Sequence, residues 1–431
     1  MTSSAAPEVR DFSAVDFFAD PQLVADPYAF LRRMRETSPV LREPGRGVLV
    51  VTGYEEAVAI LGDHEGFSSC NTVTGPFPGF PVPLEGRDET AVQELIEKRR
   101  GELPFSDQLP SFDPPTHTAH RSLLSRLITP KRLKENEEYL ERLADEVLTP
   151  YLARGGGEFI AEVGTPVALL VIADLLGVPE EDRAELAAVL TGDVALGSTD
   201  GVEMAHTPLE YLYTRFSDYI ADRRAQPRPD ILTELAQATF PDGTLPDVID
   251  VVRVAANLFS AGQETTVRLL SSAMMILAEN PDLQDTLRRN PDLVPPFIEE
   301  ALRFESPIRG DFRLARKPTT VGGVEIAPGA TVMVHYGAAN RDPRIFDKPD
   351  AFDLSRPNAR RHIAFGRGIH SCVGAPLART EGRVLIQRLL ERTDSIDVDE
   401  ARHGAAGERR YDYVPTFILR GLTDLHLKVA S

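Results

Sequence analysis

The chain has 431 residues, of which 47 are lysine or arginine and 66 are aspartate or glutamate, so its formal net charge is −19. This acidic balance argues against binding to nucleic acid or to an anionic membrane surface. Its only two cysteines, Cys70 and Cys372, exclude a disulfide framework and are typical of a reducing cytoplasm. No basic region followed by an apolar run opens the sequence, so we expect a soluble protein without a signal peptide.

Apolar residues recur at helical spacing along most of the chain, with proline or glycine marking the ends of the periodic segments. The helices that this pattern predicts lie at 27–37, 54–62, 117–127, 133–153, 166–176, 180–190, 208–224, 247–279, 282–288, 294–304 and 373–391. Strand-like segments are few and lie at 47–52, 321–326, 330–334 and 416–420. Turn signals make 337–370 mostly loop. The sequence therefore predicts a mostly α-helical protein with a small β portion.

The chain carries no obvious division into domains. It has no long glycine- or serine-rich linker, no block of like charges and no internal repeat. We therefore expect a single domain over residues 1–431, with a loosely ordered N-terminal segment up to about residue 20.

The segment 247–279 is the longest predicted helix, and at about 1.5 Å per residue it would span roughly 50 Å. It is apolar on most sides, so it should run through the core. In its middle stands Ala261-Gly-Gln-Glu264-Thr265. Glycine weakens a helix, and an unpaired carboxylate is costly inside a core. Residues that are each unfavourable in a buried helix, when they occur together at one point, indicate a functional site there.

The most informative stretch, from Phe365 to Arg379, reads FGRGIHSCVGAPLAR. Its first two glycines allow a tight loop whose backbone can approach a ligand. Cys372 comes just before a predicted helix, and the N-terminus of a helix stabilises a thiolate. Gly374 leaves room where a flat cofactor could approach. Together these features favour a functional cysteine over a small buried hydrophobic residue.

The stretch resembles the cysteine loop of the cytochrome P450 family, FGxGxHxCxGxxLAR, at every specified position. Glu300-Ala-Leu-Arg303 is similar to the family's ExxR motif, and Arg356 is similar to the third member of that ion network. The resemblance implies the cytochrome P450 fold, in which a long central helix lies over haem b and the cysteine loop lies beneath it. It also implies that Cys372 is the axial ligand of the iron, because a thiolate donates electron density that favours O–O cleavage.

The resemblance further implies which residues contact the haem. The matching positions are His117, Arg121, Ala261, Arg313, His362, Phe365, His370 and Gly374. Two of them, His117 and Arg121, are four residues apart and share a helix face, and cationic or hydrogen-bonding groups of this kind suit the two propionates. His120 lies on another side of that helix, so we do not expect it to take part.

In the family, the pattern of Ala261 to Thr265 belongs to oxygen activation. The resemblance implies that Glu264 passes protons inward from solvent and that the Thr265 hydroxyl donates a hydrogen bond on the oxygen side. The substrate is then a small organic molecule that is oxidised with O2. The residues taken to suggest an apolar pocket are Phe77, Phe80, Phe417 and Ile418. For Arg309, in the same region, we expect a surface ion pair rather than a substrate contact.

Electrons are expected from a separate partner, because two cysteines cannot hold an iron–sulfur cluster and the haem fold uses the whole length. By resemblance that partner is a ferredoxin with its NAD(P)H-dependent reductase. Between Pro114 and Lys134 no residue is acidic. The cationic residues of this stretch are Arg121, Arg126, Lys131, Arg132 and Lys134. Together with Arg367 and Arg379 they predict a positive patch that would steer an acidic ferredoxin.

Two alternatives remain open at this point. One is a haem-thiolate enzyme driven by peroxide, and the other is a haem-thiolate protein that binds or senses ligands without turnover. The acid–alcohol pair Glu264-Thr265 argues against both, because peroxide-driven members usually lack this pair and a sensor has no need of proton delivery.

Overall fold

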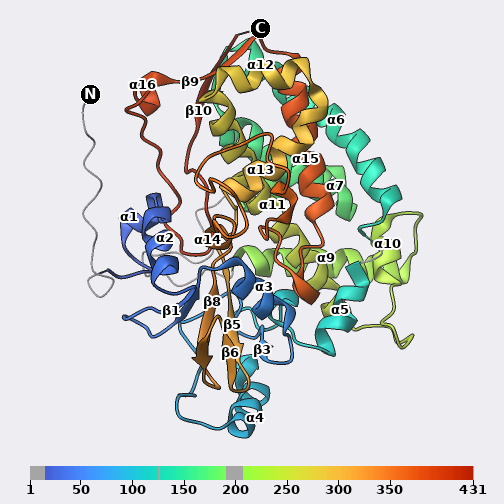
Figure 1. The fold of residues 1–431 in the computed structure, drawn as a ribbon. Helices are drawn as coiled ribbons and strands as arrows, with labels where there is room; N and C mark the ends of the chain where they lie inside the picture. The colour runs from blue at the N-terminus through green and yellow to red at the C-terminus, as the bar shows by residue number, and fades with distance from the viewer. Residues whose placement is uncertain (1–14, 125–126, 191–206, 431) are drawn as a thin grey trace.

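The computed structural model describes residues 15–124, 127–190 and 207–430. Helices dominate these residues, and the strands gather in small sheets at one side and one end of the molecule (Figure 1). The predicted mostly α-helical class is therefore confirmed.

Each helix that the sequence predicts is present, with ends that differ by a few residues. The helices of at least nine residues are α2 (Tyr28–Thr37), α3 (Tyr54–Gly62), α4 (Glu89–Arg99), α5 (Thr116–Leu124), α6 (Pro130–Ala153), α7 (Thr165–Leu176), α8 (Glu180–Leu190), α9 (Thr207–Ala225), α11 (Val248–Ala278), α12 (Pro281–Arg289), α13 (Val294–Phe304) and α15 (Ala375–Glu391). The shorter ones are α1 (Pro21–Ala25), α10 (Ile231–Ala236), α14 (Tyr336–Ala339) and α16 (Glu400–His403). Helix α4 was not predicted, since it buries only Val92 and Ile96 and its apolar periodicity is weak.

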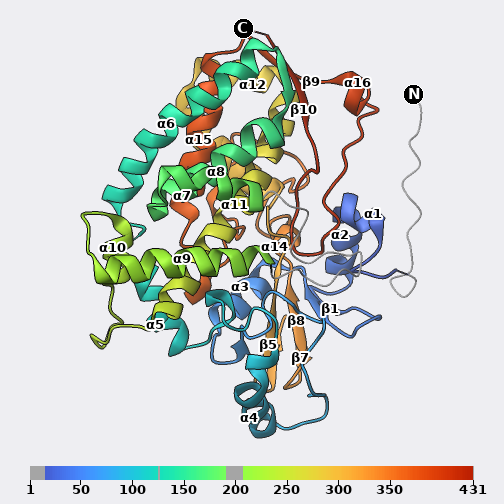
Figure 2. The ribbon, with the colours of Figure 1, turned by 180° about the vertical axis from the view of Figure 1, so that it is seen from behind.

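Helix α11 runs through the middle of the helical part, where it packs against α7, α9, α13 and α15 (Figures 1 and 2). Gly262 lies at its contact with α7, where an added Cβ would stand 3.2 Å from the Cδ1 atom of Ile172. The missing side chain thus lets the two helices approach closely. The helix ends before Asn280-Pro281, as predicted, because proline disfavours helical backbone in the preceding residue.

A mixed five-stranded sheet forms the other side of the molecule. Its order is β1-β2-β8-β5-β3, in which β2 and β8 are parallel and the other neighbours antiparallel. The bounds of these strands are β1 (Val40–Arg42), β2 (Leu49–Val51), β3 (Phe67–Ser68), β5 (Asp311–Ala315) and β8 (Thr331–Val334). A second sheet has the order β4-β10-β9, from β4 (Gly156–Glu158), β9 (Ser395–Val398) and β10 (His426–Ala430).

Two predicted strands were wrong. The segment 321–326 is not one strand but the end of a hairpin between β6 (Thr319–Val321) and β7 (Val324–Ile326). Gly322 and Gly323 turn the chain there with φ angles of 57° and 78°, which suit glycine. The segment 416–420 forms only an isolated bridge, between Leu419 and Ile308. Strand β5 was missed, because its aspartate and arginine interrupt the apolar pattern.

The N-terminal stretch expected to be loosely ordered is described only from residue 15 onward. There Val15 and Phe18 are buried, so this part of the expectation was wrong. The ring of Phe18 packs edge-on against Phe77 and Phe417, with centroids 5.5 and 5.6 Å apart. Buried aromatic surface of this kind holds the segment against the sheet.

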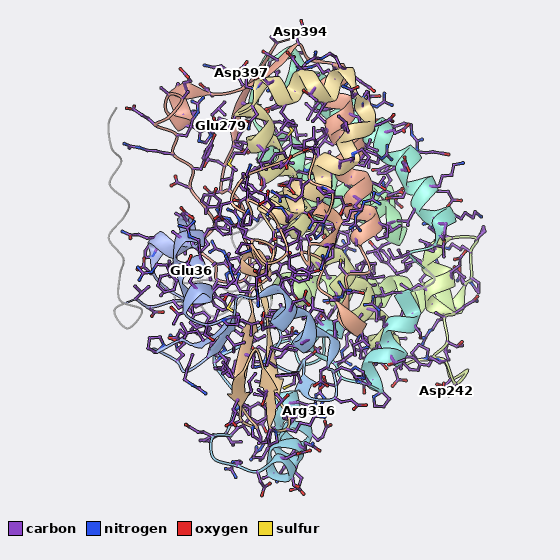
Figure 3. All side chains as sticks on the ribbon, viewed as in Figure 1. Glu36, Asp242, Glu279, Arg316, Asp394 and Asp397 are labelled. Carbon is purple, nitrogen blue, oxygen red and sulfur yellow. The ribbon has the colours of Figure 1, made fainter. Side chains whose placement is uncertain are left out.

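The negative charge of the chain is carried largely on its surface. Acidic side chains such as Glu36, Asp242 and Asp394 are exposed at the outline of the molecule (Figure 3). Among the described residues, no helix is both long enough and apolar enough to cross a membrane.

The predicted ion network forms in the core beside α13. Arg303 donates two hydrogen bonds of 2.8 Å to the Glu300 carboxylate, and Arg356 Nε donates one of 3.0 Å. The side chains of Glu300 and Arg303 are fully buried. Arg303 also donates to the carbonyls of Asn340 and Pro349, at 3.0 and 2.8 Å. The network therefore fastens α13 to the loop that leads to Cys372.

Candidate active site

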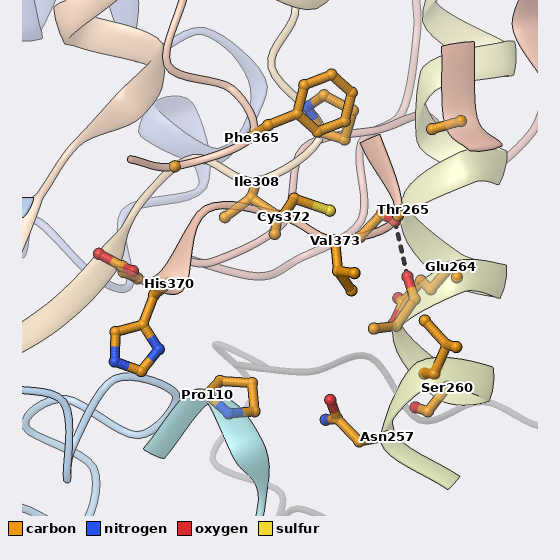
Figure 4. A pocket seen from close by; sticks show the side chains of 18 of the residues that line it. Pro110, Asn257, Ser260, Glu264, Thr265, Ile308, Phe365, His370, Cys372 and Val373 are labelled. Carbon is orange, nitrogen blue, oxygen red and sulfur yellow. Dashed lines mark hydrogen bonds between the residues drawn. The ribbon is translucent and has the colours of Figure 1, made fainter. Parts of the chain in front are cut away.

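A cavity of about 410 Å³ lies between α11 and the loop that carries Cys372. Its lining includes Ala261, Glu264 and Thr265 from α11 together with Cys372 and Gly374. The fold thus brings the two most informative sequence stretches to the same cavity, although more than a hundred residues separate them in the chain. Figure 4 shows the cysteine loop facing the part of α11 that carries Thr265.

The cysteine loop is held tightly in place. Gly366 and Gly368 have φ angles of 65° and 73°, and a Cβ on Gly368 would lie 2.2 Å from the carbonyl oxygen of Leu61. Only glycine fits that close approach. The amide of Cys372 donates a hydrogen bond of 2.8 Å to the carbonyl of Phe365. These contacts aim the cysteine side chain at the cavity.

The side chain of Cys372 is exposed, but to this internal cavity rather than to the outer surface. Burial among protein atoms raises the pKa of its thiol, whereas the amides of Gly374 and Ala375 and the Arg121 guanidinium act to lower that pKa. These amides lie at the start of α15, whose N-terminus favours a negative sulfur. The surroundings therefore suit a thiolate, provided that a cation binds the sulfur and offsets the cost of burial.

Cationic and imidazole groups gather at one end of the cavity. Arg121 and Arg313 both line it, and so does His370. Arg313 is almost fully buried and lies 2.8 Å from Asp311. His117 is not among the lining residues, but its ring packs against that of His370, and its two ring nitrogens are buried without a partner among the described residues. Unpaired buried donors beside two guanidinium groups fit an anionic ligand.

His362 does not belong to this group, so its predicted propionate contact was wrong. Its Nε2 atom lies 3.1 Å from the Glu299 carboxylate, and its Nδ1 atom accepts a hydrogen bond from the amide of Ala364. Arg379 donates to the same Glu299 at 2.6 Å and stacks over the ring of Phe365. Both nitrogens of His362 are thus used away from the cavity. His120 lies outside the lining, as His117 does, and its Nδ1 atom lies 2.9 Å from the carbonyl oxygen of Thr116.

The acid–alcohol pair lies on the cavity side of α11. Burial raises the pKa of Glu264, and the Arg268 guanidinium, 3.3 Å away, partly counteracts that rise. The hydroxyl of Thr265 donates a hydrogen bond of 2.7 Å to the carbonyl of Ala261 (dashed in Figure 4). This corrects the expectation that the threonine proton points to the oxygen side. With its proton engaged, the Thr265 oxygen faces the cavity as a hydrogen-bond acceptor.

Glu381 also lines the cavity, and the sequence interpretation missed it. It lies on α15, fully enclosed, and accepts a hydrogen bond of 3.0 Å from the hydroxyl of Thr266. Burial raises its pKa to about 8. A glutamate two residues after Arg379 gives no signal in the sequence, because only the packing of α15 on α11 removes it from water.

Only some of the residues expected to form the substrate pocket line the cavity. Of the four expected residues, Ile418 lines the cavity, and Ile308 lines it as well, whereas Phe77 and Phe417 pack on Phe18 instead. Phe80 packs in a separate small cluster with Cys70.

Arg309 is buried, which corrects the expected surface ion pair. Its Nε atom donates to the carbonyl of Leu419 at 2.8 Å, and its Nη1 atom donates to the carbonyl of Leu23 at 2.9 Å. It therefore ties the cavity wall to α1.

The residues present fit a haem group. The cavity has a cysteine sulfur that opens into it and two guanidinium groups at one end. Beside these, the buried nitrogens of His117 have no protein partner in the described part of the chain. A flat dianionic cofactor with a thiolate-bound metal would satisfy all three features.

Comparisons with known proteins agree with this arrangement. The family model described as Cytochrome P450 matches residues 203–396. Cytochrome P450 144 of Mycobacterium tuberculosis is 33% identical over 420 residues, which cover 96% of this chain and 91% of that protein. The monooxygenase PikC of Streptomyces venezuelae is 31% identical and covers 99% of this chain and 95% of its own. The substrate-free structure of Mycobacterium marinum cytochrome P450 CYP150A6 superposes with a TM-score of 0.92 at 52% identity, covering 97% of this chain and 99% of its own.

The fold and the cavity thus define an oxidoreductase of the haem-binding kind, and the chain belongs to the cytochrome P450 family. Proteins of this family are monooxygenases that bind haem b through a cysteine thiolate. The predicted family, fold and cofactor are therefore confirmed.

Proposed function

We propose that this protein inserts one oxygen atom from O2 into a small, largely apolar organic substrate, with Cys372 as the axial ligand of haem b. The observation that carries the proposal is the cavity itself, which Cys372 and the pair Glu264 and Thr265 line together. When bound, the haem supplies the oxygen activation, which a thiolate ligand promotes by electron donation. We further propose that the whole chain acts as one catalytic domain, since its relatives align over more than nine-tenths of it.

Several residues would hold the haem. Arg121, Arg313, His117 and His370 would bind the propionates, in keeping with the cationic end of the cavity. Phe365 would shield the sulfur from water, and the stacked Arg379 keeps its ring in place. Ala261 and Gly374 both line the cavity and carry little or no side chain, so they would leave space for the macrocycle.

Glu264 and Thr265 would transfer protons and position hydrogen bonds at the α11 side of the cavity. Glu264 has a raised pKa and a hydrogen bond to Arg268, so it can take a proton from water and release it inward. The Thr265 oxygen can accept a hydrogen bond from a water or another protonated group in the cavity, because its own proton is held by Ala261. This arrangement favours turnover with O2 over both alternatives, peroxide-driven catalysis and ligand sensing.

A ferredoxin is the proposed electron donor, and the proposal rests on the face beside Cys372. Ion pairs join Glu137 of α6 to Arg383 of α15 and Asp145 to Arg392, so the two helices run in parallel. The start of α6 therefore lies beside the start of α15, which follows Cys372 directly. Arg126 lies outside the described residues, and Lys131 and Arg132 are already paired with Glu135.

Other cations on this face are better placed to meet a partner. Arg379 is already paired with Glu299, but Lys134 and Arg367 are exposed. They would steer an acidic ferredoxin toward the haem by long-range attraction.

The experiment that tests the assignment compares the reduced carbon-monoxide complex of the wild type with that of Cys372→His. We expect the family's red-shifted Soret band and monooxygenase activity in the wild type, and loss of both in the variant. Imidazole is a weaker electron donor than a thiolate. Cys70→Ser serves as the control, since Cys70 is buried away from the cavity. A Cys372→His variant that kept both band and activity would contradict the proposal.

A further inference from the structure

The cavity has a second polar region, apart from the one that would bind the propionates. Asn257 and Ser260 line it from α11, and Gln108 lines it from the loop before α5. Figure 4 shows Asn257 and Ser260 on the same helix as Glu264 and Thr265, with Pro110 across the cavity from them. Arg253, one helical turn before Asn257, bonds at 3.2 Å to Asp107, the neighbour of Gln108. Gln108 and Asn257 therefore belong to the same end of the cavity.

The hydrogen-bonding groups of this region are largely unused. Within the part of the chain that the structure describes, the Asn257 amide and the Ser260 hydroxyl form no side-chain hydrogen bond, although both face the cavity. Gln108 is 97% buried, and its Oε1 atom has no partner among the described residues. Its Nε2 atom donates to the hydroxyl of Tyr213 on α9. Because Tyr213 in turn donates to Asp107 at 3.3 Å, this chain of bonds orients the Gln108 amide and leaves its oxygen unpaired.

The region is polar without offering a free charge. The Arg253 guanidinium is occupied by Asp107 and, at 3.3 Å, by Asp250. It does not line the cavity, and neither does any other described cation at this end. A carboxylate or phosphate placed here would be removed from water without a cationic partner, which is costly. A neutral hydroxyl or carbonyl group would instead satisfy the amide and hydroxyl side chains.

The distance from this region to the proposed site of oxidation follows from the helix. Asn257 and Ser260 come eight and five residues before Thr265 on α11, which corresponds to about 12 and 8 Å along its axis. Apolar side chains also line the cavity, among them Leu109 and Ile172. Apolar lining with polar groups at one end fixes the direction in which a ligand lies.

We propose that the substrate is an elongated, largely apolar molecule with one neutral hydroxyl or carbonyl group, which Asn257, Ser260 and Gln108 bind. That group lies about 8–12 Å along α11 from the level of Thr265, where oxidation is proposed. The inference deepens the proposed function and rests on it, because the position of oxidation is taken from Cys372 and Thr265. It assigns a specificity role to three residues that take no part in the proton transfer or in binding the haem.

The test uses three alkylimidazoles in which the imidazole binds the haem iron and the chain can span about 12 Å. Their chains end in a methyl, a hydroxyl or a carboxylate group. Affinity is measured from the absorbance change as the imidazole binds, in the haem-loaded wild type and in Asn257→Leu. The matched control is Gln237→Leu, which removes an exposed amide outside the cavity. The reduced carbon-monoxide spectrum verifies that each variant is folded and loaded.

We expect the ratio of hydroxyl to methyl affinity to fall about tenfold in Asn257→Leu, the effect of losing roughly 1.4 kcal/mol of hydrogen bonding. The ratio should fall less in Ser260→Ala and stay unchanged in Gln237→Leu. The carboxylate probe should bind more weakly than the hydroxyl probe in the wild type. An equal ratio in the wild type and Asn257→Leu would overturn this inference and leave the haem assignment intact. Failure of every probe to change the spectrum would overturn the haem assignment and the inference together.

Discussion

The imidazole rings of His117 and His370 lie with their centroids 4.2 Å apart and join α5 to the cysteine loop. Burial lowers the pKa of His117 to about 4 and that of His370 to about 2, so both rings are neutral at neutral pH. Each neutral ring carries one N–H that can donate a hydrogen bond, and the Nε2 atom of His370 already lies 3.0 Å from the Ser69 hydroxyl. Arg121 and Arg313 supply the positive charge. A carboxylate of the cofactor would find both kinds of group at this end of the cavity.

Replacing Thr265 should uncouple oxygen consumption from product formation. In Thr265→Ala we expect NADH and O2 to be consumed, with more hydrogen peroxide and severalfold less product per electron pair. Substrate affinity should change little, because the hydroxyl serves the oxygen side. The measurement is the yield of product and peroxide per NADH. Thr265→Ser, which keeps the hydroxyl, is the control and should restore coupling. Normal coupling in Thr265→Ala would remove this residue from the mechanism.

The buried carboxylate of Glu300 should be essential to stability. Glu300→Ala leaves Arg303 and Arg356 buried without their anion, and the loss in free energy of unfolding should be roughly 3–5 kcal/mol. Yield of haem-loaded protein and denaturant unfolding would measure it. The control is Glu102→Ala, which breaks an exposed pair with Arg99 and should cost less than about 1 kcal/mol. Similar losses of unfolding free energy in both variants would show that burial of the ion network does not add to stability.

The stability of the protein should depend on pH through Glu381. Its folded pKa is about 8, against 4.5 for the free carboxyl group, so the folded state holds the proton more tightly. This stabilisation is complete below about pH 4.5 and is lost progressively as the pH rises to about 8. Glu381→Gln cannot ionise, so we expect a flatter profile and higher stability than wild type at pH 9. Melting temperatures from pH 5 to 9 would check this, and parallel profiles would refute it.

Charge reversal beside the cysteine loop should slow reduction by ferredoxin. In Lys134→Glu and Arg367→Glu, association should be slower and less sensitive to ionic strength, because the long-range attraction is weakened. Peroxide-driven turnover needs no partner and should change little. Lys98→Glu, at an exposed position of α4, which lies at the lower end of the molecule in Figure 1, is the control. Equal loss of both activities would place Lys134 and Arg367 in the fold rather than at a docking surface.

The sequence alone determined the family, the cofactor and most helices. These features rest on local patterns: the loop from Phe365 to Arg379, the Glu300-Arg303 pair and apolar spacing along each helix. A loop motif or a helix face depends on residues within a few positions of one another, so it can be recognised in the sequence without the tertiary structure.

Only the tertiary structure decided which polar groups face the cavity. In the sequence His370 is a weaker candidate than His362, yet Glu299 binds His362 outside the cavity while His370 lines it. Arg309 is buried on backbone carbonyls, and Glu381 acquires its high pKa from enclosure between α15 and α11. The direction of a side chain and its exposure to water are set by partners distant in the chain, and no local pattern encodes those partners.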